Sequence, residues 1–452
     1  MSQSREVSRR EFIRKTTAAG AAGVAVPYLV SSTALAQEGK PGANDKLNIA
    51  LIGCGGMGRG NLGNCARYPD VVVVGACDVW KARRDATVAA FKGTAKPYSD
   101  YREVLAQKDI DGVIVGTPPH WHALQTIEAC EAGKDVYVQK PMTIYLDEAL
   151  AIRRAAEQHK RITQVGTQIH AGGNYRRVVE WVRSGKLGQI SVARTFLTAN
   201  QGEQGIGDVP NSDPPPGIDW NLWVGPGPMR PFNQMIVAGA HTNCSFMDYS
   251  GGYTPGMAPH IIDLPFWALE LGIPEVTHCS GGRYVTRDCG DAYDTQQVLW
   301  QYPNFTMTWM LQLCNSYGFD LQGGNNNIGR RLGVYFHGVD GTLYANYGMH
   351  KVVPEGDRMK DAKPPEPSIP PSPGHEREWL DSIRSRKQPS CNVSYHYKLD
   401  AAIGLANIAY KLGRSIDFDP KTEKIVGDAE AAKLARPEYR DPWKFPAKYL
   451  DA

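Results

Sequence analysis

Short apolar runs alternate with stretches of helical spacing between residues 49 and 166. The runs are rich in β-branched residues and are bounded by glycine, proline or charged residues, which is typical of buried strands. They cover residues 49–52, 71–76, 96–98, 111–117, 135–139 and 162–166. Strands that alternate with helices at this pitch predict a doubly wound parallel sheet, in which ligands bind at the carboxyl ends of the strands.

The pattern changes after about residue 168. A long stretch rich in glycine and proline, 202–231, precedes aromatic-rich alternating segments at 296–302, 306–312 and 332–337. Alternation of this kind indicates an open, largely antiparallel sheet. We therefore expect an α/β protein with a first domain over 46–168. A second α/β domain over 169–452 should contain this sheet and end in helices and a tail.

The first 36 residues differ in composition from the rest. Paired arginines at 9 and 10 precede a small, mildly apolar run, and Ala34-Leu35-Ala36 fits a cleavage site. The sequence predicts a twin-arginine signal peptide over 1–36 and a polar linker over 37–45, and hence a periplasmic or secreted protein. A membrane anchor is the competing interpretation, which weak hydrophobicity and Pro27 disfavour.

Charge and motif content exclude several classes of partner. The chain has a formal charge of +3, and the signal region alone holds five basic and two acidic residues, so the remainder is about neutral. No basic field remains for nucleic acid or for an anionic membrane surface, and we expect neither as a partner of the mature protein. Neither C-x-x-C nor H-E-x-x-H occurs, so we expect no metal site.

The first strand ends in a glycine-rich turn, Gly53-Cys54-Gly55-Gly56-Met57-Gly58. A turn without Cβ atoms lets backbone N–H groups and a helix N-terminus approach a pyrophosphate. Asp78 ends the second strand about 20 residues beyond the turn, where a carboxylate accepts the ribose hydroxyls and repels a 2′-phosphate. The sequence therefore predicts NAD as the cofactor over NADP, although Arg83 and Arg84 keep NADP as an alternative.

Three further strand ends should meet near the nicotinamide. They are Thr117-Pro118 with His122, Gln139-Lys140-Pro141 and Gly166-Thr167-Gln168. We therefore expect twelve cofactor-binding residues: Gly53, Gly55, Gly56, Met57, Gly58, Asp78, Thr117, Pro118, His122, Gln139, Lys140 and Gln168.

These motifs together resemble the glucose-fructose oxidoreductase, inositol dehydrogenase and rhizopine-catabolism (Gfo/Idh/MocA) oxidoreductases. The resemblance rests on the glycine turn, TPPHWH, AGKDVYVQKP, GTQ, DWNLWVGPGP, DYSGG followed by HIID, and GRSIDFDP. It implies an N-terminal Rossmann domain and a C-terminal α/β domain whose open sheet presents a sugar site. It also implies a homo-oligomer.

The resemblance implies catalytic roles for Lys140, His260 and Asp263. Lys140 stands where the family's lysine holds the cofactor and hydrogen-bonds the reacting hydroxyl, and a lysine there stabilises a developing alkoxide. His260 stands where a histidine exchanges a proton while hydride moves to or from the nicotinamide. Asp263 matches the family's second acid.

Two positions depart from the family pattern. Gln139 replaces a glutamate beside the lysine, and Gly256 stands where dehydrogenases of the family carry an aspartate four residues before the histidine. Asp263, Asp248 and His241 are the candidates to replace that aspartate. Substrate contacts are expected after the sixth strand and from aromatic, acidic or basic residues of the second domain. They are His170, Tyr175, Arg176, Trp223, His241, Asp248 and Tyr249.

The sequence thus predicts an exported NAD-dependent oxidoreductase acting on a hydroxyl of a sugar, glycoside or polyol. With no free NAD pool expected outside the cytoplasm, the cofactor should stay tightly bound and be recycled in place. One alternative is an NAD-dependent glycosidase that oxidises, eliminates and re-reduces, because the signal and DWNLWVGPGP also resemble exported enzymes of that type. A second alternative is a non-catalytic sugar-binding protein.

Overall fold

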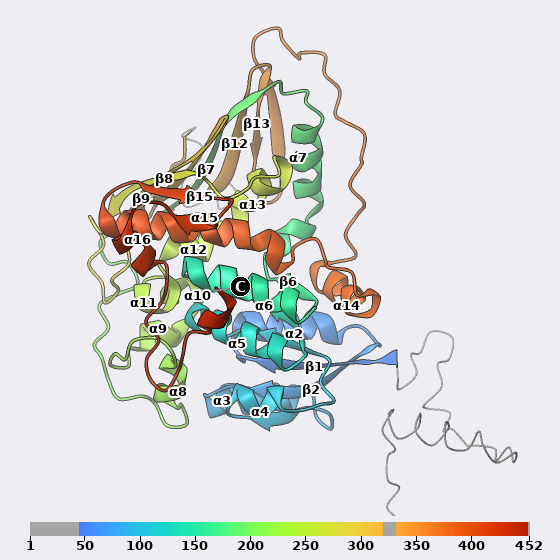
Figure 1. Ribbon diagram of the computed structural model, residues 1–452, viewed down its shortest axis with the longest axis vertical. Coiled ribbons are helices and arrows are strands. Elements are labelled where there is room, and N and C mark those ends of the chain that lie inside the picture. Colours follow the sequence, from blue (N-terminus) through green and yellow to red (C-terminus); the bar gives the residue numbers. More distant parts are fainter. Residues whose placement is uncertain (1–44, 320–330, 451–452) are drawn as a thin grey trace, which may run out of the picture. The chain divides into compact units, whose positions relative to one another are not determined.

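Six short strands form a parallel sheet in the order β3-β2-β1-β4-β5-β6 in the computed structural model, which describes residues 45–319 and 331–450 (Figure 1). The strands are β1 Leu47–Ile52, β2 Val71–Cys77, β3 Lys96–Tyr98, β4 Gly112–Val115, β5 Asp135–Val138 and β6 Thr163–Val165. The predicted doubly wound sheet is confirmed. The predicted signal peptide, and the linker up to residue 44, lie outside the described residues.

Helices cover both faces of this sheet. They are α2 Gly56–Ala66, α3 Lys81–Ala90, α4 Tyr101–Leu105, α5 Pro119–Glu131 and α6 Leu146–Gln158. Alternate residues of β1 point to opposite faces. Ile49 packs in a cluster with Leu62 of α2, whereas Ile52 packs in a second cluster with Leu124 of α5. Both strand faces are therefore apolar, which explains the continuous apolar runs in the sequence.

A second sheet has ten strands in the order β14-β13-β12-β7-β10-β9-β8-β15-β16, with β11 pairing to β7. They are β7 Ile190–Asn200, β8 Val276–Gly282, β9 Thr295–Tyr302, β10 Phe305–Gln312, β11 Cys314–Asn315, β12 Leu332–Gly338, β13 Gly341–Ala345, β14 His350–Pro354, β15 Ile416–Asp419 and β16 Lys424–Ile425. β7 and β10 run parallel and the other pairs are antiparallel. The predicted largely antiparallel sheet is confirmed.

One face of the second sheet is covered by helices α7 Gly173–Arg183, α13 Pro259–Ala268 and α15 Val393–Leu412. Burial along β9 alternates, so Trp300 lies in the core while Leu299 is exposed on the other face. α15 begins after Asn392, whose side chain accepts from the Tyr395 N–H, and ends before Gly413 at φ +64°.

Segments from the second half of the chain return to the first sheet. Helix α14, His375–Ser385, packs against α2 through the buried Trp379. The last described residues include α16 Ala429–Leu434 and the 3₁₀ turn η4 Ala447–Tyr449. Between these two elements the ring of Trp443 meets that of Trp121 at 4.8 Å between centroids. Among the described residues, no helix combines the length and hydropathy that crossing a bilayer requires.

The stretch rich in glycine and proline, 202–231, contains the short helix α8 Trp220–Val224, and four more short helices follow it (Figure 1). They are α9 Gln234–Ala238, α10 Ala240–Asn243, α11 Met247–Ser250 and α12 Tyr253–Met257. Backbone hydrogen bonds tie the start of this segment to the end of β2: Lys81 N–H donates to Gly217 and Asp219 N–H donates to Val79. The segment therefore faces the strand ends where ligands are expected.

Candidate functional site

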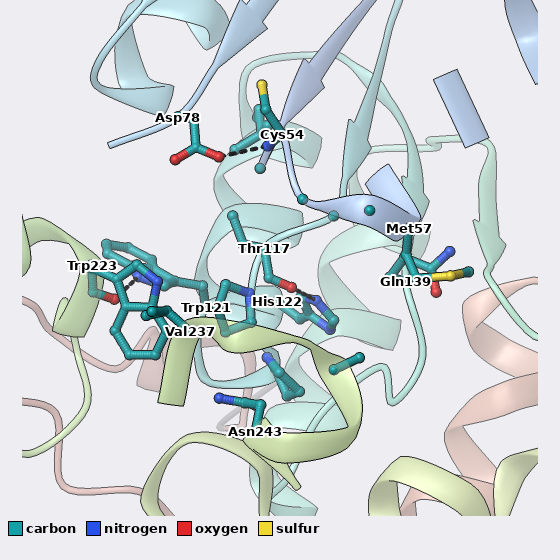
Figure 2. A pocket seen from close by; sticks show the side chains of 18 of the residues that line it. Cys54, Met57, Asp78, Thr117, Trp121, His122, Gln139, Trp223, Val237 and Asn243 are labelled. Carbon is teal, nitrogen blue, oxygen red and sulfur yellow. Dashed lines mark hydrogen bonds between the residues drawn. The ribbon is translucent and has the colours of Figure 1, made fainter. Parts of the chain in front are cut away.

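A cavity of about 720 Å³ lies at the carboxyl ends of β1, β2, β4 and β5. One wall is formed by these strand ends, and the opposite wall by the segment that carries Val237 and Asn243 (Figure 2). Trp443 from the tail also contributes to the lining. The volume falls within the range of about 300–1,000 Å³ that is usual for small-molecule sites.

Two glycines of the turn pack against the backbone, and two others have free space where a Cβ would lie. A Cβ on Gly53 would lie 2.5 Å from the Thr117 nitrogen, and one on Gly58 would lie 2.3 Å from the Gly53 oxygen. Nothing lies within 4 Å of a Cβ built on Gly55 or Gly56, and both line the cavity. Gly55 also caps α2 without a side-chain hydrogen bond, so the first N–H groups of that helix are available to an anion. The residues present therefore fit a diphosphate.

Asp78 lies at the end of β2 and lines the same cavity. Its Oδ2 accepts from the Cys54 N–H at 2.7 Å and its Oδ1 accepts from the Trp80 N–H at 2.7 Å. Burial raises the pKa of Asp78, and these two bonds oppose that shift. The carboxylate is thus held in one orientation, with lone pairs left for ribose hydroxyls.

Lys140 follows β5 and also lines the cavity. Its Nζ donates to the Gly256 carbonyl at 3.0 Å. Burial lowers the pKa of Lys140, and the nearby Cys244 thiol opposes that shift. Gln139 beside it is buried, and its Nε2 donates to Asn61 Oδ1 at 2.5 Å. A lysine after β5 and an acid after β2 therefore line the same cavity.

His122 joins two of the strand ends that line the site. Its Nδ1 lies 2.6 Å from the Pro141 carbonyl oxygen, and its Nε2 lies 2.6 Å from the Thr117 carbonyl oxygen. Burial lowers the pKa of His122. The ring thereby fixes the chain after β4 relative to the chain after β5. Of the twelve predicted cofactor residues, ten line the cavity, and Gly58 and Gln168 do not.

His260 and Asp263 lie in α13 and are not part of the cavity lining. The His260 ring packs against Tyr347 at 5.7 Å between centroids. Burial and then the charge of Lys140 lower the pKa of His260 well below its ordinary value. Asp263 is buried, and its carboxylate accepts from His170 Nδ1 at 2.9 Å and from the Tyr395 hydroxyl at 2.6 Å. Burial would raise the pKa of Asp263, but these neighbours lower it overall.

The predicted substrate residues separate into two groups. Trp223 and His241 line the cavity. The other five do not, because packing or other partners engage them: His170, Tyr175, Arg176, Asp248 and Tyr249. For example, the Tyr249 hydroxyl donates to the Pro228 carbonyl at 2.9 Å.

Several lining residues were not predicted from the sequence. They are Arg59, residues 236–240, Asn243, Cys244 and Trp443, among others. Arg59 directly follows the glycine turn in α2. No motif or period in the sequence marks the other positions, because they reach the site only when the segment after β7 and the tail fold back onto the first sheet.

Comparison with known proteins identifies the family. The model described as "Oxidoreductase family, NAD-binding Rossmann fold" matches residues 47–167, and that of the family's C-terminal alpha/beta domain matches residues 301–445. A glycosyl hydrolase family 109 protein of Shewanella pealeana is 28% identical over 204 residues, which are 41% of this chain and 44% of that protein. An alpha-N-acetylgalactosaminidase of Shewanella oneidensis is 25% identical over 203 residues, with the same shares. These matches thus span less than half of each relative.

Solved structures share the fold. The WlbA dehydrogenase from Bordetella pertussis, in complex with NADH and UDP-GlcNAcA, superposes with a TM-score of 0.61 at 17% identity, over 83% of this chain and 99% of that one. Levoglucosan dehydrogenase, in complex with NADH and levoglucosan, superposes with a TM-score of 0.57 at 17% identity, over 82% of this chain and 99% of that one. The two family models together match more than half of the sequence, and the chain belongs to the Gfo/Idh/MocA family of NAD-binding oxidoreductases.

Proposed function

We propose that this protein is an exported NAD-dependent oxidoreductase that acts on a hydroxyl of a sugar, glycoside or polyol. One observation supports the proposal most strongly: Lys140 lines the same cavity as the open glycines and Asp78. A lysine that lines a dinucleotide site is suited to stabilise an alkoxide as it forms. When bound, NAD supplies a hydride acceptor at its nicotinamide ring.

The two predicted proton-transfer groups take different positions in the proposal. We assign the direct contact with the reacting hydroxyl to Lys140, because its ammonium lines the cavity and one donor is already held by Gly256. His260 lies behind the lining and is neutral, since burial and the lysine lower its pKa. Its role in the proposal is therefore indirect, through the neighbouring Lys140. Asp263 accepts from His170 and is not among the described residues that line the cavity, so we give it a positioning role.

The walls of the cavity support a cofactor that stays bound. Arg83 Nη2 donates to the Val237 carbonyl at 2.8 Å, which ties the covering segment to α3. The Lys81 N–H donates to the Gly217 carbonyl and the Asp219 N–H donates to the Val79 carbonyl, and Trp443 lines the cavity from the tail. We therefore expect slow release of a bound dinucleotide, and a catalytic cycle that is redox-neutral within one bound NAD.

The test starts from protein purified without added nucleotide. Sugars and glycosides are mixed with it, and the near-ultraviolet absorbance of NADH is followed. We expect substrate to reduce the bound cofactor, and Lys140→Met to abolish reduction. If the wild-type protein carries no dinucleotide, or if no hydroxyl compound reduces it, the proposal fails. Sugar binding without any reduction would support the non-catalytic alternative.

A glycosidase remains the second candidate function, because two of the matching relatives carry names of that kind. Oxidation of a ring hydroxyl acidifies the neighbouring C–H, so the aglycone can leave by elimination without the paired carboxylates of ordinary glycosidases. Incubation with aryl glycosides and no added NAD separates the two candidates. Release of the aglycone supports the glycosidase, and accumulation of a keto-sugar supports the oxidoreductase.

Export is tested separately from catalysis. Residues 1–45 are fused to a folded reporter, and its accumulation in the periplasm is measured. We expect Arg9→Lys combined with Arg10→Lys to block export, and Arg14→Lys to permit it. Equal export of all three forms contradicts a twin-arginine signal.

A homo-oligomer is also part of the proposal. The outer face of the second sheet carries the exposed Leu299 on β9. We expect light scattering to give a mass above that of one chain, and Leu299→Lys to lower it. A monomer at all concentrations contradicts this expectation.

A further inference from the structure

Cys244 occupies the space that a side chain at position 256 would need. A Cβ built on Gly256 would lie 2.5 Å from Cys244 Sγ. Cys244 follows α10 and is buried, and it lines the cavity together with Gly256 and Lys140. No carboxylate side chain can therefore be placed at 256 without moving the thiol.

Lys140 consequently faces the cavity without an acidic partner among the described residues. Its ammonium has three donors, and among residues 45–319 and 331–450 one of them is engaged, by the Gly256 carbonyl. No ion pair joins it to a carboxylate in the part of the chain that the structure describes. A partly desolvated cation with two free donors is costly unless an anion or strong acceptors complete its shell.

Cationic side chains outnumber acidic ones in the cavity lining. Among the described residues, the carboxylates are Asp78 and Asp100, and the cations are Arg59, Arg83 and Lys140. Asp78 accepts from backbone N–H groups and Asp100 pairs with Arg102, whereas Lys140 donates to a backbone carbonyl. The lining is therefore net positive, and a cation such as Lys140 favours an anionic ligand.

We propose that the substrate is a sugar carrying a carboxylate, and that this carboxylate pairs with Lys140 while a neighbouring hydroxyl takes the remaining donor. In a hexuronic acid the carboxylate and the adjacent ring hydroxyl lie close enough for one ammonium to contact both. This inference rests on the proposed function and specifies its substrate class.

Two matched glycosides test the inference. Methyl β-D-glucuronide and methyl β-D-glucoside differ only in a carboxylate against a hydroxymethyl group. Binding to the purified holoprotein is measured by calorimetry, and reduction of the bound cofactor by absorbance. The galacturonide and galactoside form a second pair that covers the other C4 configuration. We expect the acidic member of at least one pair to bind at least about tenfold more tightly, which corresponds to about 1.4 kcal/mol. Added salt should narrow the difference.

Variants of Cys244 identify the cause of the preference. Cys244→Asp places a carboxylate beside Lys140 and should remove the preference for the acidic glycoside. Cys244→Ser is the matched neutral control and should keep it. Equal or weaker binding of both acidic members, or no binding of either, overturns the inference. Reduction of the cofactor by the neutral glycosides alone would overturn it while leaving the proposed oxidoreductase intact.

Discussion

Replacing Gly55 by alanine should weaken cofactor binding while leaving the fold in place. A Cβ at this position meets no atom within 4 Å, and Gly55 lines the cavity at the start of α2. Because its φ is −70°, alanine adopts the same backbone without strain. The methyl group would instead occupy the path by which the backbone N–H groups approach a diphosphate.

The size of the effect follows from the bonds that would be lost. A hydrogen bond to a charged group contributes about 1.5–3 kcal/mol. Loss of one such bond at Gly55→Ala therefore weakens NAD binding by about tenfold to about a hundredfold. The free energy of unfolding of the cofactor-free protein should change by less than about 1 kcal/mol, since only a helix N-cap is altered.

Gly58→Ala is the matched comparison. Its Cβ would lie 2.3 Å from the Gly53 oxygen and 3.1 Å from Leu51 Cδ1, so the helix and strand must move apart. Overpacking of this kind costs about 1–3 kcal/mol of stability.

The assay is the nucleotide content of each purified variant, together with thermal unfolding with and without added NAD. Full NAD occupancy in Gly55→Ala, with an unchanged thermal shift, would refute the placement of the diphosphate at this turn. Undiminished stability in Gly58→Ala would refute the packing argument.

Three further predictions concern the segments around the site. Arg83→Ala removes the bond to Val237 and should speed release of NAD about fivefold, as measured by stopped-flow displacement, whereas Arg84→Ala should not. Burial lowers the pKa of His120 to about 4, whereas an unfolded histidine titrates near 6.5. Between these two pH values the unfolded chain binds one proton more than the folded chain, so the free energy of unfolding should fall as the pH drops from about 6.5 to about 4. The dependence of the free energy of unfolding on pH should be smaller in His120→Phe. Trp379→Ala should lower the free energy of unfolding by about 3–5 kcal/mol in denaturant titrations, and a loss below about 1 kcal/mol would contradict its place in the core.

Local signals in the sequence predict the first sheet and half of the site. Apolar runs place its strands, and the rule that parallel strands end at one edge brings Asp78, Thr117 and Lys140 to one cavity. The same reasoning cannot reach Cys244 or Trp443. Both depend on contacts between distant segments, whose partners leave no periodic mark in the sequence.

Asp263 also shows why a residue that matches a family motif need not line the cavity. The resemblance names Asp263 as catalytic, yet its carboxylate is enclosed by His170 and Tyr395. A buried acid needs hydrogen-bond partners, and the nearest ones come from two other segments of the chain. Only the folded arrangement shows that the Asp263 carboxylate is directed to His170 and Tyr395 and does not line the cavity.

The most direct test of the account is a crystal structure of the protein purified with its own nucleotide and a bound glycoside. The account predicts NAD with its diphosphate at Gly55 and Gly56, and its nicotinamide beside a substrate hydroxyl that is hydrogen-bonded to Lys140. A cavity that holds no dinucleotide, or a nicotinamide ring remote from Lys140, would contradict it.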